Sequence, residues 1–394
     1  MSVERRSQDE RYRVGEIPWP VGAEGWARRA AEVLPPAIFD WLAGGAGEEW
    51  TLVANRRAFE RWRLRPRMLS GIKEREMSIN ILGTSSPVPF LLAPIGGQTV
   101  VHPDGELATA GAAAELEVPL IISTASSFTV EEIAGEMGDR PRWFQLYWVN
   151  DLDVVESFVS RAAESGCAAI VLTVDTVVMG QRDRDVRNAF SPSMAGAGLA
   201  QYVSDPAFRR RLRHSPEADL NAVRKEVASI FPHSHVTWDE IAWLRERTSL
   251  PILAKGVLTA EDATIALDVG MGGVIVSNHG GRQLDGVVSS LDALVEIRAA
   301  LGDNATVLMD SGVRRGTDVV KALALGADAV LIGRPYMYGL AVAGRAGVTA
   351  AVTQLNSELE TTLALIGVPD VHSLGRSLVT ESPRLGNPGA RGYA

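Results

Sequence analysis

Gly273-Val274-Ile275-Val276-Ser277-Asn278-His279-Gly280-Gly281-Arg282 is an apolar, β-branched run that turns abruptly into polar and glycine residues. The apolar part predicts a short strand buried on both faces. Histidine is the side chain that exchanges a proton near neutral pH, and a guanidinium can hold a carboxylate through two hydrogen bonds. The stretch therefore predicts a strand that ends by presenting His279 and Arg282. A glycine-rich turn with two merely solvated side chains is the alternative, and the rest of the chain argues against it.

Short apolar runs alternate with amphipathic helical stretches from residue 88 onwards. The runs occupy residues 89–93, 119–123, 142–147, 169–174, 251–255, 273–277, 306–310 and 329–333. The helical stretches occupy residues 105–116, 130–137, 152–165, 238–247, 260–269, 291–300 and 316–325. Eight strands with helices between them predict an α/β fold, a parallel (β/α)8 TIM barrel. A doubly wound open sheet is disfavoured, because no Gly-x-Gly-x-x-Gly turn occurs early in the chain.

The 394 residues are expected to form a single domain with four parts. Residues 1–87 form an N-terminal helical segment, in which Pro35-Pro36 separates two short helices. Residues 88–340 form the barrel, and residues 341–394 form C-terminal helices and a tail. Residues 181–236, here called the lid insertion, follow the fourth strand and are too many for an ordinary strand-to-helix loop. On a barrel this insertion would lie over the catalytic face.

Composition narrows the class of protein. A formal net charge of −9 disfavours nucleic-acid binding. The single cysteine, Cys167, precedes a buried strand, so we expect it in the core. The charged N-terminus is not a secretion signal, and no apolar run approaches the ~20 residues of a membrane span. We therefore expect a cytoplasmic protein with no membrane partner. No metal site is expected either, because His233 and His235 have no third ligand nearby.

Polar residues gather where the predicted strands end, which is where barrels carry their sites. The seventh and eighth strands end in glycine-rich turns that expose backbone N–H groups, and Arg314 and Arg334 add charge, so we predict a phosphate site there. A flat heteroaromatic ring could be hydrogen-bonded by four further strand-end side chains: Ser123, Gln145, Thr173 and Lys255. Because a lysine can stabilise negative charge that forms on such a ring, a reducible flavin fits better than a sugar phosphate.

Five residues at or just after strand ends describe the substrate. Arg182 and Arg282 can hold a carboxylate, and Tyr147 can donate to it or to a hydroxyl. His279 can take a proton, while Asp175 can orient the imidazole and stabilise its cation. The reaction implied is oxidation of a carbon that bears a hydroxyl and a carboxylate. Each residue alone could be an ordinary rim residue, but their joint placement argues against that.

The same residues lie in longer motifs. These are Phe144-Gln145-Leu146-Tyr147, Leu172-Thr173-Val174-Asp175-Thr176, Ile252-Leu253-Ala254-Lys255-Gly256, Ser277-Asn278-His279-Gly280-Gly281-Arg282-Gln283 and Asp310-Ser311-Gly312-Val313-Arg314. From Leu34 to Pro335 the chain resembles the FMN-dependent α-hydroxy acid oxidase and dehydrogenase family. The resemblance implies FMN as cofactor, a small 2-hydroxy acid as substrate, molecular oxygen or another acceptor for the electrons, and a homo-oligomer, either a tetramer or an octamer.

The resemblance also implies roles at matching positions. The flavin ring would be flanked or hydrogen-bonded by Pro94, Ile95, Gly96, Ser123, Gln145, Thr173, Lys255 and Ser277. The ribityl phosphate end would be held by Asp310, Ser311, Gly312, Val313, Arg314, Gly333 and Arg334. The catalytic group would comprise His279 as base beside Asp175, with Tyr147, Arg182 and Arg282 on the substrate and Lys255 at the ring.

Two features bear on the substrate. In the lid insertion, residues 201–206 and 235–239 resemble lactate 2-monooxygenase, in which a closed lid would keep the keto acid near the flavin until hydrogen peroxide decarboxylates it. Elsewhere the chain departs from its family. Trp41 stands where a tyrosine is usual, and Ala125 stands where glycolate oxidases carry a tryptophan. We therefore expect a substrate larger than glycolate, aromatic or branched.

Three alternatives stay open at this point. A mandelate-type oxidase would release keto acid and hydrogen peroxide without decarboxylation. A phosphate-binding barrel without redox chemistry, a lyase or isomerase, would use Lys255 to form a Schiff base. A protein that only binds flavin would show no reaction with any 2-hydroxy acid.

Overall fold

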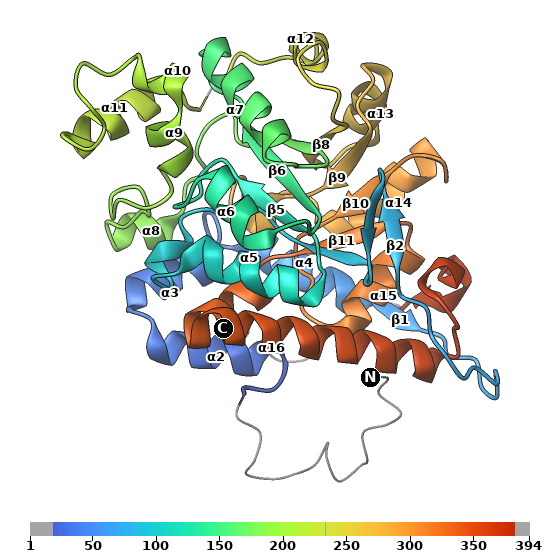
Figure 1. Ribbon diagram of the computed structural model, residues 1–394. Helices are drawn as coiled ribbons and strands as arrows, with labels where there is room; N and C mark the ends of the chain where they lie inside the picture. The colour runs from blue at the N-terminus through green and yellow to red at the C-terminus, as the bar shows by residue number, and fades with distance from the viewer. Residues whose placement is uncertain (1–18, 233, 383–394) are drawn as a thin grey trace.

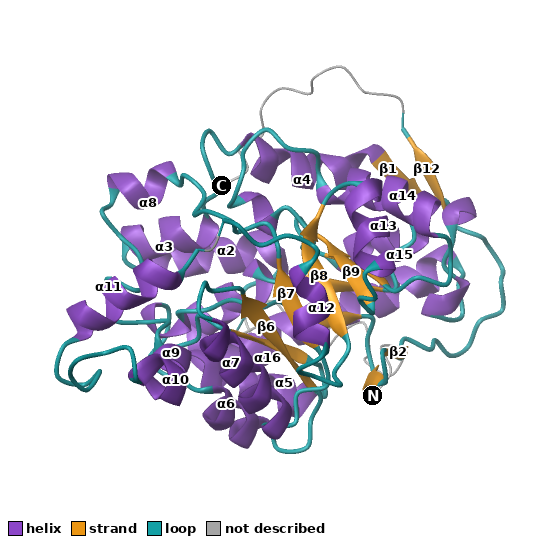
Figure 2. Ribbon diagram, turned by 90° about the horizontal axis from the view of Figure 1, so that it is seen from above, coloured by secondary structure: helices purple, strands orange, loops and turns teal. Residues whose placement is uncertain are grey.

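A closed barrel of parallel strands forms the centre of the computed structural model, which describes residues 19–232 and 234–382 (Figures 1 and 2). The barrel strands are β4 (Phe90–Leu92), β5 (Leu120–Ser123), β6 (Arg142–Tyr147), β7 (Ile170–Thr173), β8 (Ile252–Val257), β9 (Gly273–Val276), β10 (Val307–Met309) and β11 (Ala329–Ile332). Strands adjacent in sequence pair in parallel, and β11 pairs with β4 to close the ring. The barrel and all eight of its predicted strands are confirmed, with ends within two residues of the prediction.

Helices surround the barrel, and in Figure 2 they enclose the strands on all sides. They are α5 (Gly105–Leu116), α6 (Val130–Met137), α7 (Leu152–Glu164), α12 (Glu240–Arg245), α13 (Ala260–Asp268), α14 (Ser290–Leu301), α15 (Gly316–Ala324) and α16 (Arg334–Ile366). The predicted helix at 238–247 is shorter in the structure. Both N and Oγ1 of Thr237 donate to Oε2 of Glu240, at 2.8 and 2.5 Å, and this turn delays the helix to Glu240.

The N-terminal segment contains α2 (Gly22–Val33), α3 (Pro36–Ala43) and α4 (Trp50–Arg61). Pro36 opens α3 because its missing N–H would be unpaired there in any case. α4 starts at Trp50, since Glu49 before it takes a left-handed conformation with φ 63°. Figure 1 shows α2 beside α16, where Nε1 of Trp26 donates to Oε1 of Gln354 at 3.1 Å. The C-terminal helix thus ties this segment to the barrel.

Two small antiparallel sheets were not predicted. One pairs β1 (Trp62–Leu64) with β12 (Val379–Glu381), and the other pairs β2 (Ile79–Ile81) with β3 (Thr84–Ser86). Each strand has only three residues, too few for the alternation that identifies a strand in a sequence. Nε1 of Trp143, near the start of β6, donates to Oγ1 of Thr84 at 2.8 Å. The second sheet therefore lies at the N-terminal end of the barrel, away from the strand ends that carry the site.

The lid insertion follows β7, the fourth barrel strand. It contains α8 (Asp183–Arg187), α9 (Ala200–Ser204), α10 (Pro206–Arg209) and α11 (Leu220–Ile230), which extend to one side of the barrel in Figure 1. Arg161 of α7 anchors it, donating to the carbonyl of Gln201 at 3.0 Å and to Oδ2 of Asp205 at 3.3 Å. Short helical turns also follow β4, as η2 (Gln98–Val100), and α16, as η4 (Val371–Ser373) and η5 (Arg376–Leu378).

Some predictions fall on residues outside this description. Residues 1–18, 233 and 383–394 are not described, so the start of the N-terminal segment, His233 and most of the tail stay predictions.

Cys167 lies buried, as expected, and burial raises the pKa of its thiol to about 12. Within residues 19–232 and 234–382, no helix is long and apolar enough to cross a membrane, and no group of three or more metal-ligating side chains is found.

Candidate active site

A cavity of about 560 Å³ opens at the C-terminal ends of the barrel strands. Most of the predicted site residues line it: Trp41, Pro94, Ile95, Gly96, Ser123, Ala125, Tyr147, Arg182, Lys255, His279, Arg282, Asp310, Ser311, Gly312, Val313, Arg314, Gly333 and Arg334. The other four lie directly behind: Gln145, Asp175 and Ser277 bond to lining residues, and Thr173 accepts from Gln145. The structure thus brings together residues that are up to 293 positions apart in the chain, from Trp41 to Arg334.

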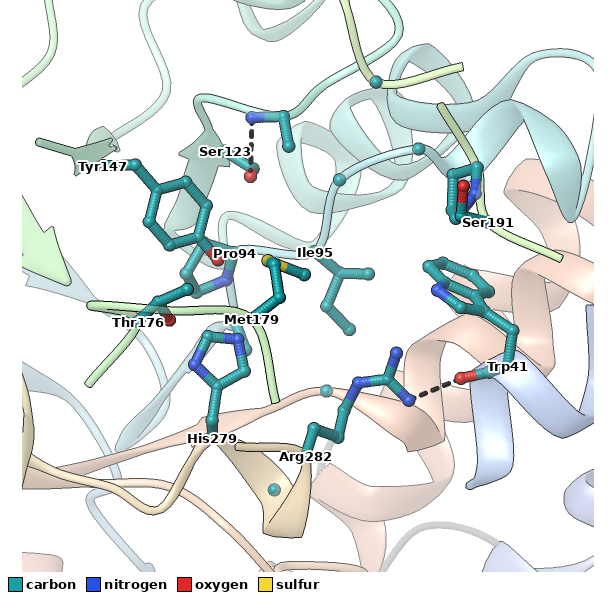
Figure 3. Close-up of a pocket in the computed structure, with 18 of the residues that line it drawn as sticks. Trp41, Pro94, Ile95, Ser123, Tyr147, Thr176, Met179, Ser191, His279 and Arg282 are labelled. Carbon is teal, nitrogen blue, oxygen red and sulfur yellow. Dashed lines mark hydrogen bonds between the residues drawn. The ribbon is translucent and has the colours of Figure 1, made fainter. Parts of the chain in front are cut away.

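His279 and Asp175 form a hydrogen-bonded pair, with 2.9 Å between Nδ1 and Oδ1. His279 opens the turn η3 (His279–Gly281) in a left-handed conformation, φ 58°, and its N–H donates to Oγ of Ser277. Burial alone would raise the pKa of Asp175. The charge and hydrogen bond of His279, with the charge of Lys255, hold it below its ordinary value instead. Asp175 is therefore an anion that fixes the imidazole, whose ring points into the cavity beside Arg282 (Figure 3).

The two predicted carboxylate-binding arginines lie on neighbouring loops. Nε of Arg182 donates to the carbonyl of Arg282 at 3.1 Å. Nη1 of Arg282 donates to the carbonyls of Trp41 and Gly44, so this nitrogen of the guanidinium is already hydrogen-bonded to the backbone. Burial lowers the pKa of both arginines, and the charge of Arg182 lowers that of Arg282 further. An anion placed between them would offset this repulsion.

Tyr147 closes the cavity on the side opposite Trp41 (Figure 3). Burial, followed by the charge of Asp175, raises the pKa of Tyr147, so its hydroxyl stays protonated and can donate. Its ring packs against Phe231 of the lid insertion, with 5.0 Å between ring centroids. The guanidinium of Arg282 lies 5.6 Å from the Trp41 ring. Aromatic walls therefore flank the His279–Arg282 pair on both sides.

Polar side chains at the C-terminal ends of β5, β6 and β7 form a hydrogen-bonded row. Oγ of Ser123 donates to Oε1 of Gln145 at 3.1 Å, and Nε2 of Gln145 donates to Oγ1 of Thr173 at 2.9 Å. Nζ of Lys255 lies 3.0 Å from Oδ2 of Asp310, a partner that the sequence did not indicate. Burial would lower the pKa of Lys255, but the charges of Asp310 and Asp175 raise it overall. Lys255 is therefore an ammonium group, held by Asp310 and Ser277.

Basic groups gather at the other end of the cavity. Arg334 donates to the carbonyls of Leu42, Gly44 and Gly280, while Nη1 of Arg314 donates to the carbonyl of Val313. Burial, followed by the charge of Arg334, lowers the pKa of Arg314 to about 9. Two desolvated cations that repel each other form a site for a dianion such as phosphate.

The pocket wall is made of backbone where a flat group would lie. A Cβ on Gly96 would sit 2.1 Å from the carbonyl oxygen of Ala125, so only glycine lets these two loops touch. Polar side chains that could hydrogen-bond a flat ring lie at one end, and the buried cations Arg314 and Arg334 lie at the other. The residues present therefore fit the isoalloxazine and the phosphate of FMN. A ligand that occupies both ends must carry a flat hydrogen-bonding ring and an anionic group, as FMN does.

Several site residues were missed by sequence reasoning. Nε2 of Gln283 donates to the carbonyls of Asp175 and Val178, and its Oε1 accepts from Arg182. Oγ1 of Thr176 donates to Oδ1 of Asp175 at 2.9 Å. Gln283 and Thr176 stand within the motifs already noted, which was the available signal. Tyr202 and Phe231 of the lid insertion also line the cavity, and nothing in their local sequence indicates it.

Known proteins similar to this chain agree with the geometry. The profile of the family described as FMN-dependent dehydrogenase matches residues 30–381. An L-lactate oxidase of Lysinibacillus sphaericus is 43% identical over 359 residues, covering 91% of this chain and 92% of that protein. A 4-hydroxymandelate oxidase of Amycolatopsis orientalis is 45% identical over 350 residues, covering 89% and 95%.

Solved structures are similar as well. A crystal structure of a mandelate oxidase with (S)-4-hydroxymandelic acid superimposes with a TM-score of 0.81 at 43% identity, covering 90% of this chain and 98% of that one. The family profile, from residue 30 to residue 381, includes α3, α4 and every strand of the barrel. This chain therefore belongs to the FMN-dependent α-hydroxy acid oxidase and dehydrogenase family, flavoenzymes that bind FMN and oxidise 2-hydroxy acids.

Proposed function

We propose that this enzyme oxidises a 2-hydroxy acid larger than glycolate to the 2-keto acid, with His279 as the catalytic base and dioxygen as the electron acceptor. The observation that carries the proposal is the His279–Asp175 pair beside Arg182 and Arg282 in one cavity. The substrate loses two electrons and two protons, and dioxygen takes up the same number to become hydrogen peroxide. When bound, FMN supplies the carrier for the two electrons.

We assign a separate role toward the substrate to each group of side chains in the cavity. Arg182 and Arg282 bind the carboxylate, since both are desolvated cations; within the described part of the chain, the carboxylate beside Arg182 is that of Asp185, 4.0 Å away and beyond hydrogen-bond distance. Tyr147 donates its hydroxyl hydrogen, because its pKa is raised. His279 takes a substrate proton at the ring nitrogen that Asp175 leaves free, and the anionic Asp175 stabilises the resulting imidazolium.

The cofactor-binding roles follow the two ends of the cavity. We assign the ring end to Pro94, Ile95, Gly96, Ser123, Gln145, Thr173, Lys255 and Ser277. We assign the phosphate end to Ser311, Gly312, Val313, Arg314, Gly333 and Arg334. Asp310 lies between the two and pairs with Lys255. Lys255 would stabilise negative charge on the ring, because it stays protonated.

Protonation of Lys255 also bears on the non-redox alternative. A Schiff-base lysine must be neutral to attack a carbonyl. The two carboxylates near Lys255 raise its pKa, which disfavours a lyase or isomerase reaction.

The product outcome depends on the lid insertion. Tyr202 and Phe231 line the cavity, which supports retention of the keto acid long enough for peroxide to decarboxylate it, as in a lactate 2-monooxygenase. Release of keto acid and peroxide, as in a mandelate-type oxidase, is the alternative, and similarity to a mandelate oxidase structure favours it. Product analysis after turnover in air separates the two.

The assembly and location stay proposals too. We propose a cytoplasmic homo-oligomer, a tetramer or octamer, of single-domain chains. Large apolar side chains that remain exposed on the single chain, such as Trp50, Val178 and Leu284, are consistent with burial between copies. Light scattering of the purified protein measures the oligomer number.

The role of His279 is tested by flavin bleaching. In the absence of air, a 2-hydroxy acid should bleach the flavin of the wild-type enzyme, while His279→Gln should retain FMN and lose at least about 100-fold in reduction rate, as for removal of a general base. His102→Gln is the matched control, since His102 lies outside the cavity, and it should react as the wild type does. Reduction of His279→Gln at the wild-type rate would remove this residue from the base role.

Substrate size is tested at Ala125. We expect kcat/KM of the wild type to favour mandelate and 2-hydroxyisocaproate over lactate and glycolate, because Ala125 contributes only a methyl group to the lining of this cavity of about 560 Å³. Ala125→Trp should lower kcat/KM for mandelate by about 100-fold and spare glycolate, since the indole would fill that space. A wild-type preference for glycolate would refute the proposal.

A further inference from the structure

A second cavity, of about 350 Å³, lies beside the active site. It is bounded by the ends of β6, β7 and β8 on one side and by the segment from Val236 to Ile241 on the other, and it is partly open to solvent. None of the roles assigned above uses this space, although Tyr147 and Thr173, which have roles in the first cavity, border it.

The two cavities share one wall. Tyr147, Thr176 and Phe231 line both of them. The rings of Tyr147 and Phe231 are in contact, and Thr176 bonds to Asp175, the partner of the catalytic base. A small molecule that crossed this wall would arrive next to His279 and the ring end of the cofactor site.

The chemistry of the second cavity differs from that of the first. Its walls are mostly aliphatic or aromatic, with Leu172, Val236, Trp238, Ile241 and Val257 among them. Its described lining includes no lysine, arginine or histidine, and Asp262 is its one charged residue. A carboxylate would find no cation there, so the substrate acid is excluded. Apolar cavities of this kind bind small apolar molecules such as xenon.

We propose that the second cavity binds dioxygen and delivers it through the shared wall to the reduced active site. The inference rests on dioxygen being the acceptor in the proposed function. Dioxygen is small, uncharged and apolar, so these walls suit it better than the arginine-lined mouth of the first cavity does. A separate entrance lets the acceptor arrive while the acid or keto acid occupies the space between Arg182 and Arg282.

The test fills the cavity and follows the two half-reactions separately. Val236→Trp and Ile241→Trp place an indole in the space, and Val33→Trp, on the exposed side of α2, is the matched control. We expect anaerobic flavin reduction by the substrate to stay within about twofold of the wild type in all three. Reoxidation of the reduced enzyme by dioxygen should slow by roughly tenfold in the two cavity variants only, because access to a bimolecular step is obstructed.

The outcomes are distinct. Unchanged reoxidation in both cavity variants overturns the proposal, and so does an equal slowing of both half-reactions, which would mean that the space holds part of the substrate. A wild-type enzyme that dioxygen does not reoxidise, but that a soluble quinone does, overturns the proposed acceptor instead. If the variants do not fold, crystals of the wild-type holoenzyme under xenon decide the matter: xenon in the cavity supports the proposal, and its absence there refutes it.

Discussion

Glu106 is a buried carboxyl group that joins two loops of the active site. Its Oε1 accepts from the N–H of Gln98 at 3.1 Å and of Ser127 at 3.0 Å, and its side chain is almost wholly enclosed. These loops carry Ile95 and Ala125, which line the cavity. Burial raises the pKa of Glu106 to about 7, from an ordinary 4.5. Glu106 of α5 thus hydrogen-bonds to both loops that form this wall of the cofactor site.

The stability of the enzyme should therefore depend on the ionisation of Glu106. Because its pKa is raised in the folded state, the stability it contributes is fully present below pH 4.5 and is lost as the pH rises through about 7. The loss is about 3 kcal/mol over this window. Glu106→Gln cannot ionise, so its free energy of unfolding should fall less with pH than that of the wild type. Denaturant titrations of both holoenzymes at pH 5 and pH 7.5 measure the difference; parallel behaviour would show that Glu106 does not titrate in this range.

The element that most affects the site is the lid insertion, because it brings residues of α9 and the end of α11 over the barrel. Arg161 of α7 holds it with three hydrogen bonds, to the carbonyl of Gln201, Oδ2 of Asp205 and Oγ of Ser204, and two further bonds to Glu131 of α6 fix the guanidinium. Asp205 has no exposed side-chain surface, caps α10 through the N–H of Phe208, and accepts from Oγ of Ser157 at 2.6 Å. The Arg161–Asp205 ion pair is therefore a buried contact among those that dock the insertion.

Loss of that ion pair should loosen the insertion. Arg161→Met leaves the carboxylate of Asp205 buried without its cation, at a cost of about 3–5 kcal/mol. We expect faster proteolysis between residues 181 and 236 and a higher KM for the acid. Arg209→Met is the matched control, since Arg209 pairs with the exposed Glu217, and such a surface pair contributes at most about 1 kcal/mol. Asp205→Asn added to Arg161→Met should recover part of the loss, and no recovery would argue against an uncompensated charge.

At the scale of the whole molecule, closure of the barrel concentrates positive charge at one end. Arg182, Arg282, Arg314 and Arg334 line one cavity, and burial, followed by the charge of neighbouring arginines, lowers the pKa of Arg282 and of Arg314. This charge is held in place by carbonyl groups of the N-terminal segment, Leu42 and Gly44, which accept from Arg334. The folded protein without an anion there is under electrostatic strain.

Removal of FMN should therefore lower Tm, and inorganic phosphate should restore part of it. An anion present at about 100 times its Kd stabilises the folded state by about 2.7 kcal/mol. Arg314→Met should abolish the effect of phosphate on the apoprotein, because it removes one of the two cations at that end. Thermal unfolding with phosphate and, at matched ionic strength, with chloride measures this. An equal response to both salts would indicate general screening and no anion site.

The sequence by itself predicted the barrel and a set of residues that the structure brings together at the C-terminal ends of its strands. Strand and helix periods are local properties, so eight apolar runs fixed the strands to within two residues, and parallel strands in a barrel bring their C-terminal ends to one face. Only the tertiary structure decided how those residues pair. Asp310 pairs with Lys255, Gln283 ties Asp175 to Arg182, Arg282 is bound to the carbonyl of Trp41, and Phe231 meets Tyr147. Such contacts depend on loop conformation across long stretches of chain, and no local periodicity encodes them.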